Sequence, residues 1–288
     1  MRVAKFIALF ALISVFVLLV AHLLYTFSFR AVEQFPADTQ LEHMVNKTAL
    51  VIVAHDDEAS TFAGTIAYLR SKGWKVDFLC FYKRENAEIE ALRKSEALQA
   101  GRIQQLRNVE LIDLNMQKKP LPYIAVPYSD FEEYFFIDSV EAAIAKAIVK
   151  SNPSIIFSLD DVIGGYGHSE HVLVGQLSRK MANQLNSEGK AHVEYLYHHV
   201  YPSSMANRMM ADQPVYEISK KIYNCTGMPE ANVQITISPF SYEKMSTIKA
   251  YASQHRNLKK FIKHYHLYPH WLYFRIFDKE FFRVIRLE

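Results

Sequence analysis

Ala49-Leu50-Val51-Ile52-Val53-Ala54 is a continuous run of apolar residues, and His55-Asp56-Asp57-Glu58 follows it directly. A strand that is buried on both faces has such a run, and strands of this kind belong to parallel sheets. Further apolar runs follow in the chain, and segments with helical spacing separate them. Strands that alternate with helices in this way predict an α/β fold with a mainly parallel sheet.

The expected elements continue through most of the chain. The other strands of the parallel sheet are expected at residues 76–82, 109–114 and 154–158, and the helices at residues 62–73, 86–106, 137–149 and 169–185. Shorter strand-like runs follow at residues 193–197, 215–218 and 233–237, before a helical segment at residues 241–254. Residues 117–130 contain three prolines and are expected to form a loop.

A second group of chemically active residues, Gly164-Gly165-Tyr166-Gly167-His168-Ser169-Glu170-His171, follows the strand expected at residues 154–158. Three of the nine glycines of the chain lie in this group. In open α/β sheets, ligands bind outside the carboxyl ends of the strands, so segments that follow different strands meet at one edge. We therefore expect this group and His55-Asp56-Asp57-Glu58 to form one site.

Histidine and carboxylate side chains at such a site suit a catalytic zinc ion, which takes three protein ligands and leaves one position for water. His55, one aspartate of the Asp56-Asp57 pair and His171 would supply these ligands. Bound zinc lowers the pKa of its water toward ~7, and a nearby carboxylate can accept the proton and return it to a leaving amine. Either group of residues alone also suits a structural role, because aspartates often cap helices. The two groups together favour a metal site.

The other polar side chains of the second group suit supporting roles. Tyr166 and His168 can donate hydrogen bonds to a developing oxyanion. Glu170 can orient a histidine through the outer nitrogen of its ring.

Both groups resemble the motifs of the PIG-L or LmbE-like family of zinc-dependent N-deacetylases, which read Ala-His-Pro-Asp-Asp-Glu and Gly-His-Pro-Asp-His. The chain has Ala54-His55-Asp56-Asp57-Glu58 and Gly167-His168-Ser169-Glu170-His171 at these places. Arg93-Lys94-Ser95-Glu96-Ala97 also resembles the Arg-x-x-Glu-Ala helix of the family. The resemblance covers residues 48–256 and implies a Rossmann-like fold with helices on both faces of the sheet.

The resemblance also implies an activity, which is hydrolysis of the acetamide of an N-acetylglucosamine-type sugar on a glycolipid or glycan. The cofactor would be one Zn²⁺ ion or another divalent metal. The alternative is a catalytically impaired family member that acts as a membrane-anchored sugar- or partner-binding module. By the resemblance, the metal ligands are His55, Asp57 and His171, the general base is Asp56, the groups that stabilise the tetrahedral intermediate are Tyr166 and His168, and Arg93 contacts substrate.

The first motif lacks the proline of the family, which leaves two alignments of its carboxylates. If the loop is shortened, Asp56 is the base and Asp57 the metal ligand, and Glu58 aligns with the family without a further gap. We prefer this alignment. If the spacing from His55 is kept instead, Asp57 is the base and Glu58 the ligand. One residue moves a side chain by several ångströms, so the two alignments predict different sites.

The N-terminal segment has no Asp, Glu, Lys or Arg between Phe6 and Phe29. As a helix, these 24 residues would span about 36 Å, which exceeds the ~30 Å of a hydrocarbon core. The run has no clear cleavage site, so we expect an uncleaved anchor with a single membrane span rather than a signal peptide. Arg2 and Lys5 before the span, and acidic residues after it, favour a cytoplasmic N-terminus and a globular domain on the other side.

We therefore expect an anchor at residues 1–30, a linker at 31–47, a deacetylase domain at 48–256 and an aromatic and basic C-terminal extension at 257–288. The extension suits a membrane surface, but we favour the interpretation that its aromatic residues complete the core. A net charge of +3 with mixed signs argues against a nucleic-acid partner. The expected partners are the acetylated amino-sugar substrate and the membrane.

Overall fold

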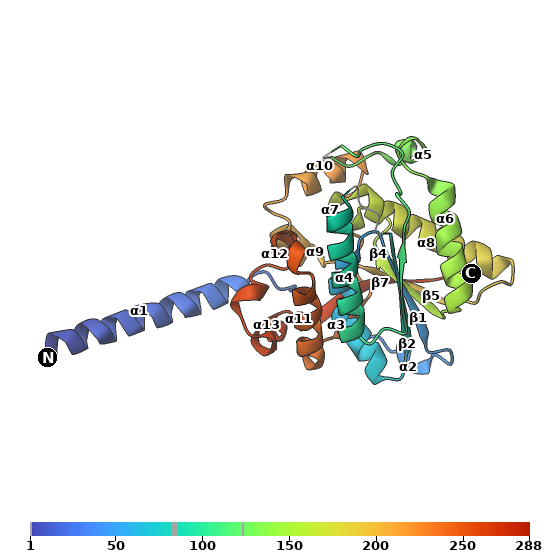
Figure 1. The fold of residues 1–288 in the computed structure, drawn as a ribbon. Coiled ribbons are helices and arrows are strands. Elements are labelled where there is room, and N and C mark those ends of the chain that lie inside the picture. Colours follow the sequence, from blue (N-terminus) through green and yellow to red (C-terminus); the bar gives the residue numbers. More distant parts are fainter. Residues whose placement is uncertain (1, 82–85, 123) are drawn as a thin grey trace.

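The computed structural model describes residues 2–81, 86–122 and 124–288. Its centre is a seven-stranded sheet in the order β3-β2-β1-β4-β5-β7-β6 (Figure 1). The strands from β3 to β5 run parallel, and β7 runs antiparallel to both of its neighbours. The expected α/β fold with a mainly parallel sheet is confirmed. The strands are β1 (Thr48–Val53), β2 (Lys75–Phe81), β3 (Asn108–Ile112), β4 (Ile155–Leu159), β5 (Tyr195–His199), β6 (Val233–Thr236) and β7 (Lys279–Arg286).

β1 and β4 lie side by side at the point where the strand order reverses. From β1 the chain continues to β2 and β3 on one side, and from β4 it continues to β5 on the other. Every residue of β1 is buried, which explains its continuous apolar sequence. Ligands bind outside the carboxyl ends of the strands at such a switch point. The segments that follow β1 and β4 are therefore placed where a site is expected.

Helices cover both faces of the sheet (Figure 1). On one face, α3 (Ala59–Ser71), α4 (Ala87–Ile103) and α11 (Ser241–Ala250) pack together, and on the other face α6 (Ile137–Ser151) packs against α8 (Ser169–Ser187). The buried residues of α6 recur every three or four positions, so one apolar stripe faces the sheet. The short helices are α2 (Gln40–His43), α5 (Phe131–Tyr134), α7 (Gly164–Gly167), α9 (Ser203–Met209), α10 (Pro214–Ile222), α12 (His255–Phe261) and α13 (His270–Ile276), and 3-10 turns lie at Asp56–Glu58, Tyr128–Asp130, Ser238–Phe240, Ala252–Gln254 and Tyr265–Leu267.

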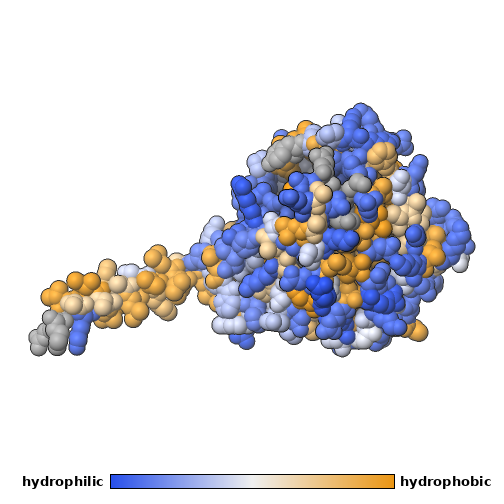
Figure 2. All heavy atoms as spheres, in the orientation of Figure 1, coloured by the Kyte–Doolittle hydropathy of each residue, from blue (hydrophilic) through white to orange (hydrophobic). Residues whose placement is uncertain are grey.

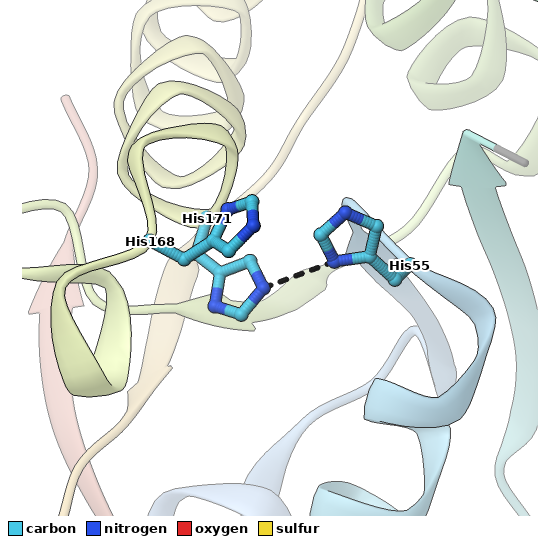
Figure 3. Close-up of side chains that lie close together, drawn as sticks. All are labelled: His55, His168 and His171. Carbon is cyan, nitrogen blue, oxygen red and sulfur yellow. Dashed lines mark hydrogen bonds between the residues drawn. The ribbon is translucent and has the colours of Figure 1, made fainter. Parts of the chain in front are cut away.

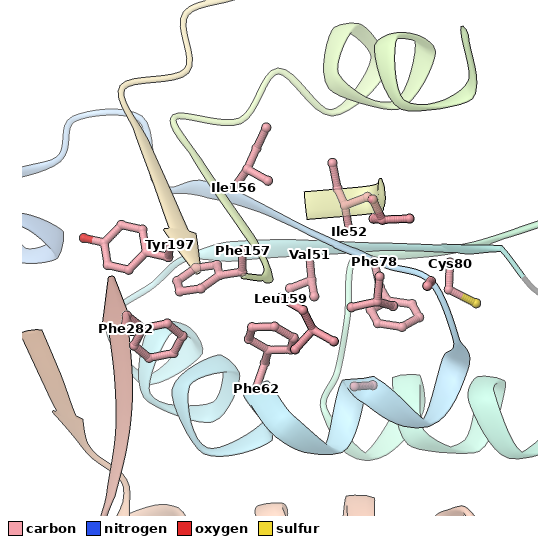
Figure 4. Packing of buried hydrophobic residues seen from close by; sticks show 14 of the residues in the cluster. Val51, Ile52, Phe62, Phe78, Cys80, Ile156, Phe157, Leu159, Tyr197 and Phe282 are labelled. Atoms are coloured by element: carbon pink, nitrogen blue, oxygen red, sulfur yellow. The ribbon is translucent and has the colours of Figure 1, made fainter. Parts of the chain in front are cut away.

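Aromatic rings fill the core between the sheet and α3 (Figure 4). The ring centroid of Phe157 in β4 lies 5.5 Å from that of Phe282 in β7 and 6.2 Å from that of Phe62 in α3. Tyr197 in β5 adds a ring 4.8 Å from Phe157. All four side chains are buried. This cluster joins segments that are far apart in the sequence.

The segment after residue 257 contributes to the same sheet, because β7 lies between β5 and β6. Tyr265, Tyr273 and Phe274 are buried together with Phe282. The expectation that aromatic residues of this segment complete the core is confirmed for these side chains. Residues 31–47, which we expected to form a linker, also hold buried apolar side chains, such as Leu41.

The strand expected at residues 215–218 is wrong, because these residues belong to α10. Pro214 occupies the first turn of this helix, where its fixed φ and its missing N–H favour a helix start. Tyr216 and Ser219 are buried three residues apart, which is helical and not strand-like spacing. The expected end of the second strand at residue 82 lies outside the described residues.

The N-terminal helix α1 (Arg2–Phe27) projects away from the domain (Figure 1). Val3–Phe27 is long and apolar enough to cross a membrane, and its most apolar stretch makes no buried contact with the domain. Figure 2 shows apolar side chains around this helix, whereas most of the visible surface of the domain is hydrophilic. The helix is compatible with a membrane anchor or a signal sequence.

Phe282→Ala tests whether β7 is integral to the core. We expect the free energy of unfolding to fall by about 3–5 kcal/mol, because the change leaves a cavity among buried rings. Arg286→Ala, at the exposed end of the same strand, should change it by less than about 0.5 kcal/mol. Denaturant unfolding of both variants in detergent measures the difference. Equal, small losses would show that β7 is dispensable for the core.

Candidate metal centre

The backbone after β1 turns sharply and brings the carboxylate of Glu58 back toward the end of the strand. Asp56–Glu58 form a 3-10 turn with His55 at its N-cap. Glu58 Oε2 accepts a hydrogen bond from the backbone N–H of Ala54 at 3.1 Å, and Oε1 accepts one from that of His55 at 3.2 Å. The turn and these bonds direct the carboxylate of Glu58 toward β4.

The loop after β4 is held by Asp160, a buried residue that sequence reasoning missed. Its carboxylate accepts hydrogen bonds from the backbone N–H groups of Val162, Ile163, Gly164 and Gly165 at 2.6–3.1 Å. An aspartate that directly follows a strand and precedes a glycine pair is a signal for such a turn. Burial raises the pKa of Asp160, although the four hydrogen bonds oppose this shift.

Gly164 shows why this loop needs glycine. Its φ is +60°, and a Cβ atom there would lie 2.7 Å from Cβ of His171. Any other residue would push His171 out of place, so the glycine permits the close approach of loop and histidine.

Three electron-pair donors meet between the ends of β1 and β4. Nδ1 of His55 lies 2.7 Å from Oε1 of Glu58 and 3.0 Å from Nε2 of His171. Nε2 of His171 lies 2.7 Å from the same oxygen of Glu58. Figure 3 shows the rings of His55 and His171 approaching each other from the two segments. The side chains of Glu58 and His171 are buried, and that of His55 is 19% exposed.

The outer nitrogens of both histidines are hydrogen-bonded to oxygen atoms. Nδ1 of His171 donates to the carbonyl oxygen of Gly164 at 3.0 Å. Nε2 of His55 donates to Oε2 of Glu170 at 2.7 Å, and Gln117 donates to the other oxygen of Glu170 at 3.0 Å. With a proton on each outer nitrogen, each inner nitrogen presents a lone pair, which is the arrangement found around metal-binding histidines.

This donor set fits a divalent cation. The donor atoms, 2.7–3.0 Å apart, form a triangle smaller than that of tetrahedral ligands ~2.0–2.2 Å from a zinc ion, which lie ~3.3–3.6 Å from one another. The three side chains would therefore move apart by roughly 0.3–0.9 Å to hold the ion. Two neutral imidazoles and one carboxylate are ligands that zinc prefers. In addition, donor atoms of His55, His168 and His171 all lie within 4.8 Å of one another, which is consistent with a metal site.

The charges of these groups are strongly coupled. Burial lowers the pKa of His55, but hydrogen bonds to Glu170 and Glu58 raise it to about 10. Burial raises the pKa of Glu58, but His171 and His55 hold it well below its usual range. A proton therefore stabilises the metal-free cluster. A cation that binds there takes the place of this proton, so metal binding is expected to weaken as the pH falls.

His168 and Tyr166 lie beside the donor triangle. The ring of His168 stacks on that of His171, with centroids 4.6 Å apart, and its Nδ1 accepts the backbone N–H of Glu170 at 3.3 Å. Burial, followed by the nearby His171 and His55, lowers the pKa of His168 to about 3. The ring of Tyr166 meets that of His171 edge to face at 5.3 Å, and burial raises the pKa of Tyr166. Both side chains line the cavity above the triangle.

The two aspartates after His55 face Arg93 of α4. Arg93 donates to Asp56 from Nε at 2.8 Å and from Nη2 at 2.5 Å, and Nη2 also donates to Asp57 at 2.7 Å. The side chain of Asp56 is only 1% exposed, whereas that of Asp57 is 20% exposed and lines the cavity. Burial lowers the pKa of Arg93, but the aspartates outweigh it and raise this pKa above its ordinary value.

A cavity of about 980 Å³ opens above the donor triangle. Polar side chains, including Gln254, Asn257 and Lys260, line part of its wall. Another part is apolar and is formed by α9 and α12, with the side chains of Met205, Met209, Met210, Leu258 and Phe261. The space suits a ligand that has both a polar and an apolar portion.

The structure thus brings together His55, Glu58, His168, Glu170 and His171. It places Asp57 at the edge of this cluster and Asp56 behind it, and both aspartates accept hydrogen bonds from Arg93. Arg93 lines the cavity, but its hydrogen bonds are to the aspartates. The sequence analysis did not predict the role of Gln117, which donates a hydrogen bond to Glu170. The one sequence feature that could have indicated this role is its position in a loop after a strand.

Comparisons with known proteins agree with this geometry. The sequence profile of the family described as "PIG-L: GlcNAc-PI de-N-acetylase" matches residues 50–182. A search of curated protein sequences finds no match to the chain.

Several solved structures share the fold. The N,N'-diacetylchitobiose deacetylase from Pyrococcus horikoshii has a TM-score of 0.55 and 16% identity, over 86% of this chain and 87% of that one. The zinc-inhibited form of teicoplanin deacetylase has a TM-score of 0.53 and 13% identity, over 84% and 99%. The 4-carboxy-2-hydroxymuconate hydratase from Pseudomonas putida has a TM-score of 0.53 and 15% identity, over 83% and 96%. At these identities the likeness establishes the fold.

The matched residues contain both motifs, the 3-10 turn after β1 and the start of α8. The profile and the shared fold therefore agree on the same part of the molecule. Residues 50–182 of the chain thus belong to the PIG-L (LmbE-like) deacetylase family by this match, and the solved structures establish the fold.

Proposed function

We propose that this protein is a zinc-dependent N-deacetylase that hydrolyses the acetamide of an N-acetylglucosamine-type sugar on a glycolipid or glycan. The observation that carries the proposal is the buried triangle formed by His55, Glu58 and His171 at the floor of a large cavity. The family description names a de-N-acetylase of an N-acetylglucosamine lipid. One solved relative in fold acts on diacetylchitobiose, which is also an acetylated amino sugar.

We assign the metal ligands as His55, Glu58 and His171. Glu58 is preferred over Asp57 because Oε1 of Glu58 lies 2.7 Å from the inner nitrogens of both histidines, whereas the carboxylate of Asp57 accepts a hydrogen bond from Arg93. This assignment corresponds to the alignment that keeps the spacing from His55. Zinc is the proposed ion, although the same donors suit other divalent metals.

Asp57 is then the general base. Its carboxylate lines the cavity, and the hydrogen bond from Arg93 holds it in one orientation. When bound, zinc would polarise the acetyl carbonyl group and make a water molecule more acidic. Asp57 takes the proton from the attacking water and returns it to the amine as the C–N bond breaks. Asp56, fully engaged by Arg93, acts as a support for this arrangement.

His168 and Tyr166 are placed to stabilise the negative charge that develops on the acetyl oxygen. Both lie at the cavity wall next to His171. The raised pKa of Tyr166 keeps its hydroxyl protonated, so it can donate a hydrogen bond. Glu170 and the carbonyl of Gly164 keep His55 and His171 in the tautomers that bind metal.

We propose that α1 is an uncleaved anchor that holds the catalytic domain at a membrane. Its apolar length supports a single span, and the charges that flank it favour a domain on the non-cytoplasmic side. The apolar part of the cavity wall is in keeping with a substrate that carries a lipid or another apolar group.

Removing the metal tests the reaction class. Dialysis against a strong chelator is expected to abolish acetate release from an N-acetylglucosamine lipid, and added Zn²⁺ is expected to restore it, because the three donors form the site anew. His171→Ala should show no restoration at the same Zn²⁺ concentration. His192→Ala, which alters an exposed histidine, should behave as the unchanged protein. Full activity of His171→Ala after chelation would exclude the mechanism.

Glu58→Ala and Asp57→Asn separate the roles of the two carboxylates. We expect Glu58→Ala to lose stoichiometric zinc, since it removes one of three ligands. Asp57→Asn should keep zinc but lose about 10²–10⁴-fold in acetate release, because it removes the proton acceptor. Metal analysis by mass spectrometry and the acetate assay measure both effects, with Glu188→Ala as a surface control. Zinc loss in Asp57→Asn with retention in Glu58→Ala would support the shortened-loop alignment instead.

Arg93→Met tests whether this arginine supports the base. The change leaves two carboxylates without their cation, so we expect the free energy of unfolding to fall by about 3–5 kcal/mol. Arg102→Met, on the exposed face of the same helix, should cost less than about 0.5 kcal/mol. Denaturant unfolding measures both. A mild effect on stability with a raised KM and unchanged kcat would indicate that Arg93 binds substrate directly.

A further inference from the structure

Residues 255–277 form a segment without acidic residues. It contains five lysines and arginines, four histidines and several aromatic residues. Part of the segment is core, since Tyr265, Tyr273 and Phe274 are buried. Arg256, Lys260 and Arg275 are exposed, whereas Lys263 is paired with Asp212. We call residues 255–277 the basic segment.

Two large apolar side chains of the basic segment are exposed. Leu267 is 55% exposed and Trp271 is 57% exposed, and both lie near the start of α13. Arg275 is also exposed, one turn further along the same helix. Tryptophan together with cations is the side-chain combination found where proteins meet lipid headgroups.

The basic segment also packs against the C-terminal end of α1. The hydroxyl of Tyr268 lies 2.5 Å from Nδ1 of His22 and 3.3 Å from Oγ1 of Thr26. The ring of His264 packs against that of His22, with centroids 4.9 Å apart, and against Phe29 at 5.8 Å. Thr26 is fully buried by these contacts. The last turns of α1 and the basic segment therefore form one packed unit.

Because it is packed against α1, the basic segment has a defined depth relative to the bilayer that α1 would cross. A span needs ~20 residues, and the 25 residues of Val3–Phe27 exceed that by about five, or ~7.5 Å of helix. His22 and Thr26, which bond to Tyr268, therefore lie close to the level at which the helix leaves the hydrocarbon. Leu267 and Trp271, on either side of Tyr268 in the sequence, are held at a similar level.

We propose that the catalytic domain rests on the membrane through the basic segment, with Leu267 and Trp271 inserted into the interface of the bilayer that α1 crosses and the exposed Arg275 facing anionic headgroups. The proposal rests on the anchor role of α1 given under Proposed function. Continuity with α1, the absence of acidic residues and the exposed Trp271 favour lipid over a protein occupant.

Contact between the basic segment and the membrane also affects how a substrate would reach the metal centre. Leu258, Lys260, Phe261 and Ile262 of the basic segment also line the cavity above the metal centre. The cavity wall and the lipid-facing surface are thus parts of one segment. A substrate held in the same membrane would approach the cavity along this surface and would not need to leave the bilayer completely.

Brominated lipids test this proposal on the full chain. The protein has two tryptophans, the buried Trp74 and the exposed Trp271. The full chain is reconstituted in liposomes of phosphatidylcholine and phosphatidylglycerol, with bromine placed on the acyl chains either near the headgroup or near the terminal methyl. The emission of Trp271 is the difference between the unchanged protein and Trp271→Phe, a mild change at an exposed position.

We expect shallow bromines to quench on the order of half of the Trp271 emission, because interfacial side chains lie ~5–10 Å below the headgroups. Deep bromines should quench it less, and Trp74 should be unaffected by either. A chain that stays in the membrane after alkaline carbonate extraction but shows no quenching of Trp271 would overturn the proposal while leaving the anchor intact. Loss of the chain on extraction would instead refute the anchor. Shielding of Trp271 from both bromine and aqueous iodide would show a protein partner and would also overturn the proposal.

Discussion

A carboxylate oxygen and two imidazole lone pairs that meet 2.7–3.0 Å apart in a largely buried space repel one another unless a positive charge lies among them. The rest of the site follows from this constraint. The 3-10 turn after β1 directs Glu58 inward, and the loop after β4 presents His171 through a glycine that lets the two segments touch. Glu170 and the carbonyl of Gly164 then hold both outer nitrogens, which leaves the inner lone pairs for a cation.

The neighbouring acidic groups are divided between two sets of partners. Glu58 and Glu170 face the histidines, whereas Asp56 and Asp57 face Arg93. This division gives each of the four carboxylates a hydrogen-bonded partner although they lie close together. It also separates the tasks of the site, because the group that would hold the metal and the group that would move a proton are fixed by different partners. Asp57 alone of the two aspartates reaches the cavity, so only it is placed to meet a substrate.

The sequence predicted the parallel half of the sheet well because buried parallel strands leave long apolar runs, as β1 does. It misjudged residues 215–218, since a short apolar run has no period that separates strand from helix. It did not reveal β7, because pairing between β5 and β6 depends on long-range contacts. Both histidine motifs were placed correctly at one edge of the sheet. From the sequence we preferred Asp57 as the carboxylate beside His171, whereas Glu58 lies there in the structure, because one residue in a 3-10 turn redirects a side chain by a large angle.

X-ray absorption at the zinc edge of the purified, zinc-loaded protein identifies the ligands of the metal. We expect one site with two imidazole ligands and one carboxylate oxygen at ~2.0–2.2 Å, and loss of the carboxylate contribution when Glu58 is replaced by alanine. A spectrum with three imidazoles, or one that Glu58→Ala leaves unchanged, would contradict this expectation.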